Sequence, residues 1–221
     1  MYPCYFIIIK FLAIIVFIWY TIIVPVKYSI KRTVKGAIKV NALKREKVYT
    51  IDDIYALPDG ERAELIDGQI YSMAPPSTKH QRLLNFISTE INMYIRGKNG
   101  NCEVIPAPFA VFLNKNDESY VEPDISIICD KDKIDEKGCH GAPDWIIEIV
   151  SPSSKLMDYY TKLFKYRTVG VKEYWIVDSM KQRITVYNFE FDMMEEYTFS
   201  NKIKSGIYED FEIDFSNVSI M

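Results

Sequence analysis

The sequence predicts a domain of the α/β (α+β) class, with a central mixed β-sheet flanked by helices and an apolar helix before it. Two observations support this class. The chain has 221 residues, of which 48% are hydrophobic and 26% are charged, so it can bury the core of one domain of ordinary size. From residue 48 onward, segments with helical and strand-like hydrophobic periods follow one another. The composition excludes a disordered chain, a collagen-like repeat and a disulfide scaffold.

The net charge of −3 is the sum of two unlike parts. Residues 1–47 contain nine Lys/Arg and one acid, a balance of +8, whereas residues 48–221 contain eighteen Lys/Arg and twenty-nine Asp/Glu, a balance of −11. The negative balance argues mildly against tight nonspecific binding of nucleic acid by residues 48–221, because phosphate contacts need Lys or Arg.

The first 26 residues are almost wholly apolar, and Lys10 is the only charged residue among residues 2–26. A transmembrane helix needs about 20 apolar residues, so a span would place Lys10 near the headgroups. The basic linker of residues 27–47 would then lie on the cytoplasmic side, with the catalytic domain anchored to the inner face of a bacterial membrane. Alternatively, the translation start is assigned too far upstream and the domain begins near residue 40. The sequence leaves both interpretations open.

The four cysteines are expected to be free thiols in a reducing cytoplasm. They form no CxxC pair, and Cys139-His140 has no second pair at zinc-ligand spacing; the others are Cys4, Cys102 and Cys129.

The first half of the domain predicts a short helix, a hairpin and a long helix. Thr50 precedes an acid at the third helical position, which is typical of a capped helix through Leu57. Asp67-Gly68 favours a tight turn between strands 63–66 and 69–73. Ser77 opens a helical apolar pattern that Gly97 ends.

The second half predicts strands 103–107, 109–113, 124–129 and 145–150, then a helix from Ser151 to Val169 that Gly170 stops. Strands 174–177 and 183–189 follow, and residues 194–215 resemble a further pair. The expected result is one central mixed sheet.

Three acids fit a purely structural role poorly. Asp124 starts an apolar strand, Glu148 interrupts a strand that is apolar on both faces, and Glu64 begins the hairpin between apolar neighbours. Burying an unpaired carboxylate costs several kcal/mol, so Glu148 needs a basic side chain or a metal ion as its partner. Carboxylates from neighbouring strand ends are typical ligands of Mg²⁺, with open positions left for water and phosphate.

The helix after Ser151 places Asp158, Lys162 and Tyr166 on one face, since they are four residues apart. This face either points at the acids or forms a salt-bridged solvent surface, and the charge spacing alone favours the surface. For Tyr166, packing is favoured over a hydrogen bond in the site.

Several motifs together resemble the Uma-two family of restriction-type endonucleases in the PD-(D/E)XK superfamily. The resemblance covers roughly residues 48–190, with the motifs in the expected order. They are Glu64-Leu-Ile-Asp-Gly68, Pro75-Pro-Ser-x-x-His80, Pro123-Asp124, Glu148-Ile-Val-Ser-Pro-Ser153, Asp158-x3-Lys162-x3-Tyr166-x3-Gly170-Val171 and Glu173-Tyr-Trp-Ile-Val-Asp178.

The resemblance implies a restriction-endonuclease-like core in which Asp124 and Glu148 bind Mg²⁺ or Mn²⁺ and Glu64 is a third catalytic acid. One position departs from the superfamily pattern: Val150 stands where a catalytic lysine is expected. Lys162 on the following helix is the natural substitute, and Lys165 is the second candidate, as a catalytic or substrate-binding residue.

His80 also matches a family position. It is interpreted either as a contact to phosphate or to a residue of the site, or as a surface residue at the start of the long helix; the signal of Gln81 is weaker.

The predicted function is metal-dependent hydrolysis of DNA, with carboxylates binding Mg²⁺ and a helix-borne lysine assisting. The alternative is a catalytically silent module that keeps the nuclease fold and binds nucleic acid or protein, for which Val150 would be the signature. Convergence of Glu64, Asp124, Glu148 and Lys162 in space would favour the enzyme. A homodimer and membrane association through residues 2–26 are further expectations about partners.

Overall fold

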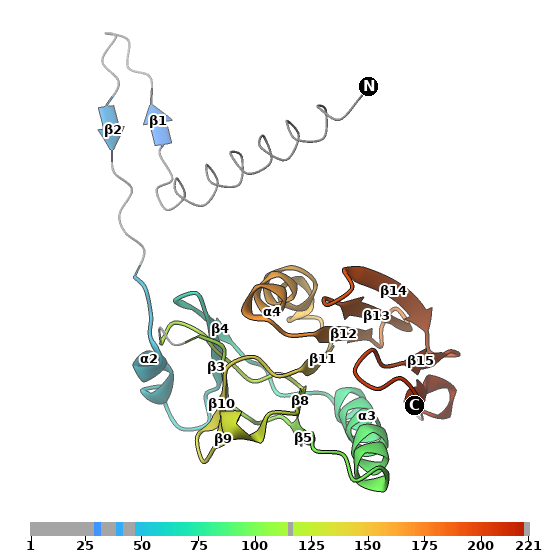
Figure 1. Cartoon of the computed structure of the whole chain (residues 1–221). Coiled ribbons are helices and arrows are strands. Elements are labelled where there is room, and N and C mark those ends of the chain that lie inside the picture. The colour runs from blue at the N-terminus through green and yellow to red at the C-terminus, as the bar shows by residue number, and fades with distance from the viewer. Residues whose placement is uncertain (1–28, 32–38, 42–46, 115–116, 219–221) are drawn as a thin grey trace, which may run out of the picture. The chain divides into compact units, whose positions relative to one another are not determined.

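A computed structural model of the protein describes residues 29–31, 39–41, 47–114 and 117–218 (Figure 1). The chain divides into two compact units, Met1–Lys47 and Val48–Met221. In the first unit, β1 (Ser29–Lys31) pairs with β2 (Lys39–Asn41) in antiparallel orientation, within the segment expected to be a basic linker. The apolar helix expected in residues 1–26 lies outside the described residues. Within the described ranges, no helix has the length and apolar character needed to cross a bilayer.

The second unit begins with the expected helix and hairpin. Helix α2 (Ile51–Tyr55) is capped by Asp53, whose Oδ2 accepts a hydrogen bond from the Thr50 backbone N–H at 2.9 Å. Strand β3 (Ala63–Ile66) then pairs with β4 (Gln69–Ser72). The turn between them needs two left-handed residues, and Asp67 (φ 49°) and Gly68 (φ 74°) provide them.

The main sheet has six strands in the order β14-β13-β12-β11-β8-β5. Only β11 and β12 are parallel, so the sheet is mixed, as predicted. The strands span Glu103–Pro106 (β5), Ile125–Ile128 (β8), Trp145–Ile149 (β11), Glu173–Asp178 (β12), Arg183–Asn188 (β13) and Met193–Thr198 (β14).

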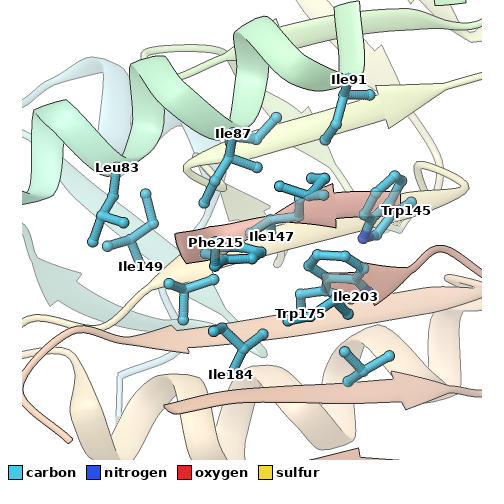
Figure 2. Close-up of a cluster of buried hydrophobic side chains, with 14 of the residues drawn as sticks. Leu83, Ile87, Ile91, Trp145, Ile147, Ile149, Trp175, Ile184, Ile203 and Phe215 are labelled. Atoms are coloured by element: carbon cyan, nitrogen blue, oxygen red, sulfur yellow. The ribbon is translucent and has the colours of Figure 1, made fainter. Parts of the chain in front are cut away.

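The two faces of this sheet are covered by different helices. Helix α3 (Thr78–Gly97) packs Leu83 and Ile87 onto Ile147 and Ile149 of β11, as Figure 2 shows. The opposite face carries Tyr166 of the second helical segment, which consists of η2 (Met157–Lys162) and α4 (Leu163–Val169). This face is the one that holds the polar residues described below.

A second six-stranded sheet, in the order β4-β3-β7-β6-β10-β9, lies outside the prediction of one central sheet. Its added strands have only two or three residues, which is too short for an alternating pattern to stand out. They are β6 (Val111–Phe112), β7 (Tyr120–Val121), β9 (Ile134–Asp135) and β10 (Gly138–His140), and the 3₁₀ turn η1 (Lys131–Lys133) precedes β9. The tail also differs from expectation: β14 joins the main sheet, while β15 (Lys202–Lys204) pairs with β16 (Glu212–Asp214), which the turn η3 (Phe215–Asn217) follows.

The expectation of free cysteines is wrong for two of the four. Cys102 and Cys129 form a disulfide, whereas Cys139 is free and buried. The reason is register: β5 and β8 pair with Glu103 opposite Ile128, so the residues just outside this pair also face each other. Cys4 lies outside the described residues.

Candidate active site

Strand pairing brings Asp124 and Glu148 side by side. Strand β8 is antiparallel to β11 with Ile125 opposite Ile147, so the next pair outward is Asp124 and Glu148, on one face of the sheet. Two hydrogen bonds fix them: the Asp124 backbone N–H donates to Glu148 Oε2 (3.4 Å), and the Ile149 backbone N–H donates to Asp124 Oδ2 (2.7 Å).

Glu64 reaches the same place from the second sheet. Its Oε1 accepts a hydrogen bond from the Glu122 backbone N–H at 3.0 Å and lies 2.9 Å from Lys162 Nζ. Strand β3, which carries Glu64, therefore connects the second sheet to the acids of the main sheet.

The ammonium group of Lys162 lies among three carboxylates. Its Nζ is 2.9 Å from Glu148 Oε1, 2.9 Å from Glu64 Oε1 and 3.8 Å from Asp158 Oδ1, and its side chain is only 5% exposed. Because it is buried, this ammonium depends on the acids rather than on water for its solvation.

The helix that carries Lys162 includes six residues of π-helix, η2, and continues as α4. Asp158, Lys162 and Tyr166 all point toward the sheet and are buried, so the interpretation of their face as a solvent surface is wrong. The sheet face beneath the helix carries Glu148, and Tyr166 both packs in the core and donates its hydroxyl to Glu148 Oε1 at 2.7 Å.

Only one of the two carboxylate oxygens of Asp158 has a hydrogen-bond partner. Its Oδ2 accepts a hydrogen bond from Ser154 Oγ at 2.6 Å, and its backbone oxygen accepts one from the Tyr174 hydroxyl at 3.0 Å. Its Oδ1 is buried without a hydrogen-bond partner.

His80 approaches Asp124 from the first turn of α3. Its Nε2 lies 3.1 Å from Asp124 Oδ2, and its Nδ1 is buried without a hydrogen-bond partner. Burial alone would lower the pKa of His80, but the hydrogen bond and charge of Asp124 raise it above the ordinary value.

Burial and the surplus of acids over bases both shift the pKa values of the site. Burial raises the pKa of Glu148 well above its usual range, against the opposing effect of Lys162, and burial raises the pKa of Asp158 to about 6. Burial would lower the pKa of Lys162, but Glu148, Glu64 and Asp158 raise it well above its usual value. The Lys162 ammonium therefore stays charged, whereas Glu148 and Asp158 take up a proton more readily than exposed carboxyl groups do.

A family profile described as "Uma2: Putative restriction endonuclease" matches residues 51–209. The chain belongs to the Uma2 family. Membership of a family with this description supports a nuclease-like function.

The chain is also similar to individual proteins. The chain is 28% identical over 129 residues to the uncharacterized protein slr1290 of Synechocystis sp., an alignment that covers 58% of this chain and 66% of that protein. It is 27% identical over 130 residues to sll1609 of the same organism, covering 58% and 72% respectively. The fold is similar to the crystal structure of a putative nuclease belonging to DUF820 from Anabaena variabilis, with a TM-score of 0.63 at 20% identity over 76% of this chain and 96% of that one.

Three further positions considered in the sequence make other contacts. Val150 is buried in the apolar core, and the Lys165 ammonium pairs with Asp67 of the hairpin turn. Gln81 is exposed. The sequence argument missed Asp158 and Ser154 as residues of the site; the signal for Asp158 was its four-residue spacing from Lys162.

Proposed function

We propose that residues 48–221 form a Mg²⁺- or Mn²⁺-dependent endonuclease that hydrolyses phosphodiester bonds of DNA. The observation that carries this proposal is the convergence of Glu64, Asp124, Glu148 and Lys162 from three strands and one helix. The same convergence disfavours the catalytically silent module, because Lys162 supplies the cation that Val150 cannot.

Asp124 and Glu148 are the residues that would hold the metal ion. Within the described ranges, no three His, Cys, Asp or Glu side chains are arranged to hold an ion by themselves. A Mg²⁺ site needs only one or two carboxylates when phosphate and water supply the other oxygens. Burial raises the pKa of the Glu148 carboxyl group, and the neighbouring acids Asp124, Asp158 and Glu64 raise it further, so a cation bound there would stabilise its charged form. Such an ion would polarise the phosphate and make its bound water a better nucleophile.

The side chains of the protein have distinct roles in this proposal. Lys162 orients the attacking water or stabilises the charge that develops on the phosphate, and Glu64 holds Lys162 in place. His80 positions Asp124 through their 3.1 Å contact. In-line attack then cleaves the P–O bond to the leaving oxygen.

The test is nicking of supercoiled plasmid by the full chain with Mg²⁺ or Mn²⁺, beside single-stranded DNA and RNA of the same sequence. Glu148→Gln and Lys162→Met should each reduce the rate at least about 100-fold. Glu173→Gln changes another buried acid, on the neighbouring strand, and is the matched control that should retain the rate. Lys165→Met tests the second candidate lysine and should retain the rate if Lys162 is the lysine of the site.

Full nicking activity in folded Glu148→Gln would overturn the site assignment. Preference for RNA would replace the substrate but keep the site. Homodimer formation and membrane association through residues 2–26 remain separate proposals, which sedimentation and detergent dependence of the full chain test.

A further inference from the structure

We propose that Asp158 is a positioning residue that replaces Glu148 as a partner of the Lys162 ammonium group when Glu148 turns to a divalent cation. This inference rests on the proposed metal-dependent function and assigns a role to the one carboxylate that this function does not use.

Lys162 and a metal ion would compete for the same oxygens. Lys162 Nζ is within hydrogen-bond distance of Glu148 Oε1 and Glu64 Oε1, at 2.9 Å each. A divalent cation on Glu148 would repel an ammonium held at that distance, and burial would strengthen the repulsion. Lys162 must therefore find another anion, or the metal ion binds weakly.

Asp158 can serve as that anion after only a small movement of the Lys162 ammonium group. Its Oδ1 lies 3.8 Å from Lys162 Nζ, so a shift of about 1 Å brings the two groups to hydrogen-bond distance. Ser154 holds Oδ2, which leaves Oδ1 as the free oxygen of a side chain that is 2% exposed. Leaving a buried carboxylate oxygen unpaired is costly, and a residue with only a structural role would be expected to have both oxygens bonded.

The helix geometry keeps donor and acceptor together. Both residues belong to the π-helical segment Met157–Lys162, and π-helical turns are frequent at functional sites. Because Asp158 and Lys162 are on one element, the ammonium can pass between Glu148 and Asp158 by side-chain rotation alone.

Binding of Mn²⁺ alone to the full chain, measured by titration calorimetry, tests the proposal in a double-mutant cycle. Asp158→Asn should weaken Mn²⁺ binding about tenfold when Lys162 is present and less than about threefold in the Lys162→Met background. Asp158→Glu should restore most of the affinity. Asp192→Asn, which removes an exposed acid, is the charge-matched control and should leave the affinity unchanged.

Each other outcome would overturn the inference and would point to a different role for Asp158 or for the site. Equal weakening in both backgrounds makes Asp158 a direct metal ligand. Unchanged affinity with a lowered melting temperature makes it a structural residue. Absence of Mn²⁺ binding by the wild-type chain overturns the proposed function itself, and the inference with it.

A second readout does not depend on the stability of the Lys162→Met chain. In ¹³C-lysine NMR, the Lys162 Cε signal, assigned by its absence in Lys162→Arg, should shift on Mg²⁺ addition in the wild type. The shift should be lost in Asp158→Asn. A shift that persists unchanged there contradicts the transfer of the ammonium to Asp158.

Discussion

The buried side chains on the two faces of strand β11 are stabilised in opposite ways. On one face, Ile147 and Ile149 lie beneath α3 in a continuous apolar cluster (Figure 2). On the other face, Glu148 is just as deeply buried but depends on Lys162, Tyr166 and the backbone of Asp124. The apolar face gains stability from burial itself, whereas the polar face must first offset the desolvation of its charges.

This difference separates the residues that stabilise the fold from the residues that are proposed to act in catalysis. An apolar face tolerates exchange of one hydrophobic side chain for another of similar volume, since dispersion contacts are not directional. In the buried ionic cluster, loss of the shared cation Lys162 leaves several acids without compensation, whereas loss of one of the acids costs less stability. Substitutions on the two faces should therefore separate stability from activity.

The largest expected effect is the contrast between Glu148→Gln and Ile147→Ala. Glu148→Gln should reduce plasmid nicking at least about 100-fold with little loss of stability, because it removes a charge that burial already disfavours. Ile147→Ala should cost about 2–5 kcal/mol of unfolding free energy through the cavity it leaves, with the rate per folded molecule retained. Urea unfolding and nicking rates on the same samples measure both. Equal loss of activity in the two variants would contradict the separation of the faces.

Removal of the buried cation should be the largest stability effect on the polar face. Lys162→Met should cost about 3–5 kcal/mol, since Glu64 and Glu148 lose their shared partner. Adding Glu148→Gln to this variant should recover part of the loss, because fewer uncompensated charges remain. Chemical unfolding of both single variants and the double variant measures this coupling. Strictly additive losses would mean that the two side chains do not act as a pair.

Glu173 is a buried acid on the apolar face of the sheet, and it predicts that the stability of the protein depends on pH. Burial raises the pKa of Glu173 to about 7, although N–H donors from Trp175 and Gly206 oppose the shift. A folded-state pKa above the unfolded value means that stability is full below about pH 4.5 and falls as the pH rises through 7. From pH 5 to 8, the wild type should therefore lose up to about 3 kcal/mol relative to Glu173→Gln. A constant difference between the two proteins over this range would show that the pKa is not raised.

The sequence predicts the framework well because its signals are local. The Asp67-Gly68 turn, the Ser77 cap and the apolar spacing of α3 each act within a few residues, and the structure has all three. In the second sheet, β6 lies within the predicted strand 109–113, whereas β7, β9 and β10 escaped prediction because two or three residues show no period. The pairing of Cys102 with Cys129 escaped because register is a property of two strands that are distant in sequence.

The candidate site was predictable in its residue types but not in its contacts. An acid inside the apolar run of β11 already demanded a cation, and the resemblance to the Uma-two family offered Lys162 as that cation. The direction of the helix face was not predicted correctly, because charges at this spacing are more often found on a solvent-exposed surface. Only the packing of the helix on the sheet decides that Asp158 and Lys162 are buried while Lys165 turns to Asp67.

The smallest predicted effect concerns α3, the element that contacts both faces of the comparison. Ser77 caps this helix by accepting the His80 backbone N–H at 3.2 Å, and the same turn presents His80 to Asp124. Ser77→Ala should cost about 1 kcal/mol of stability and lower the nicking rate only a few-fold, since the apolar contacts of α3 still hold the turn in place. Ser88→Ala, on the same helix, removes a serine whose Oγ donates to the Leu84 carbonyl and should be nearly neutral. If Ser77→Ala abolished nicking while costing no more stability than this, the position of His80 would depend on the cap rather than on the packing of α3.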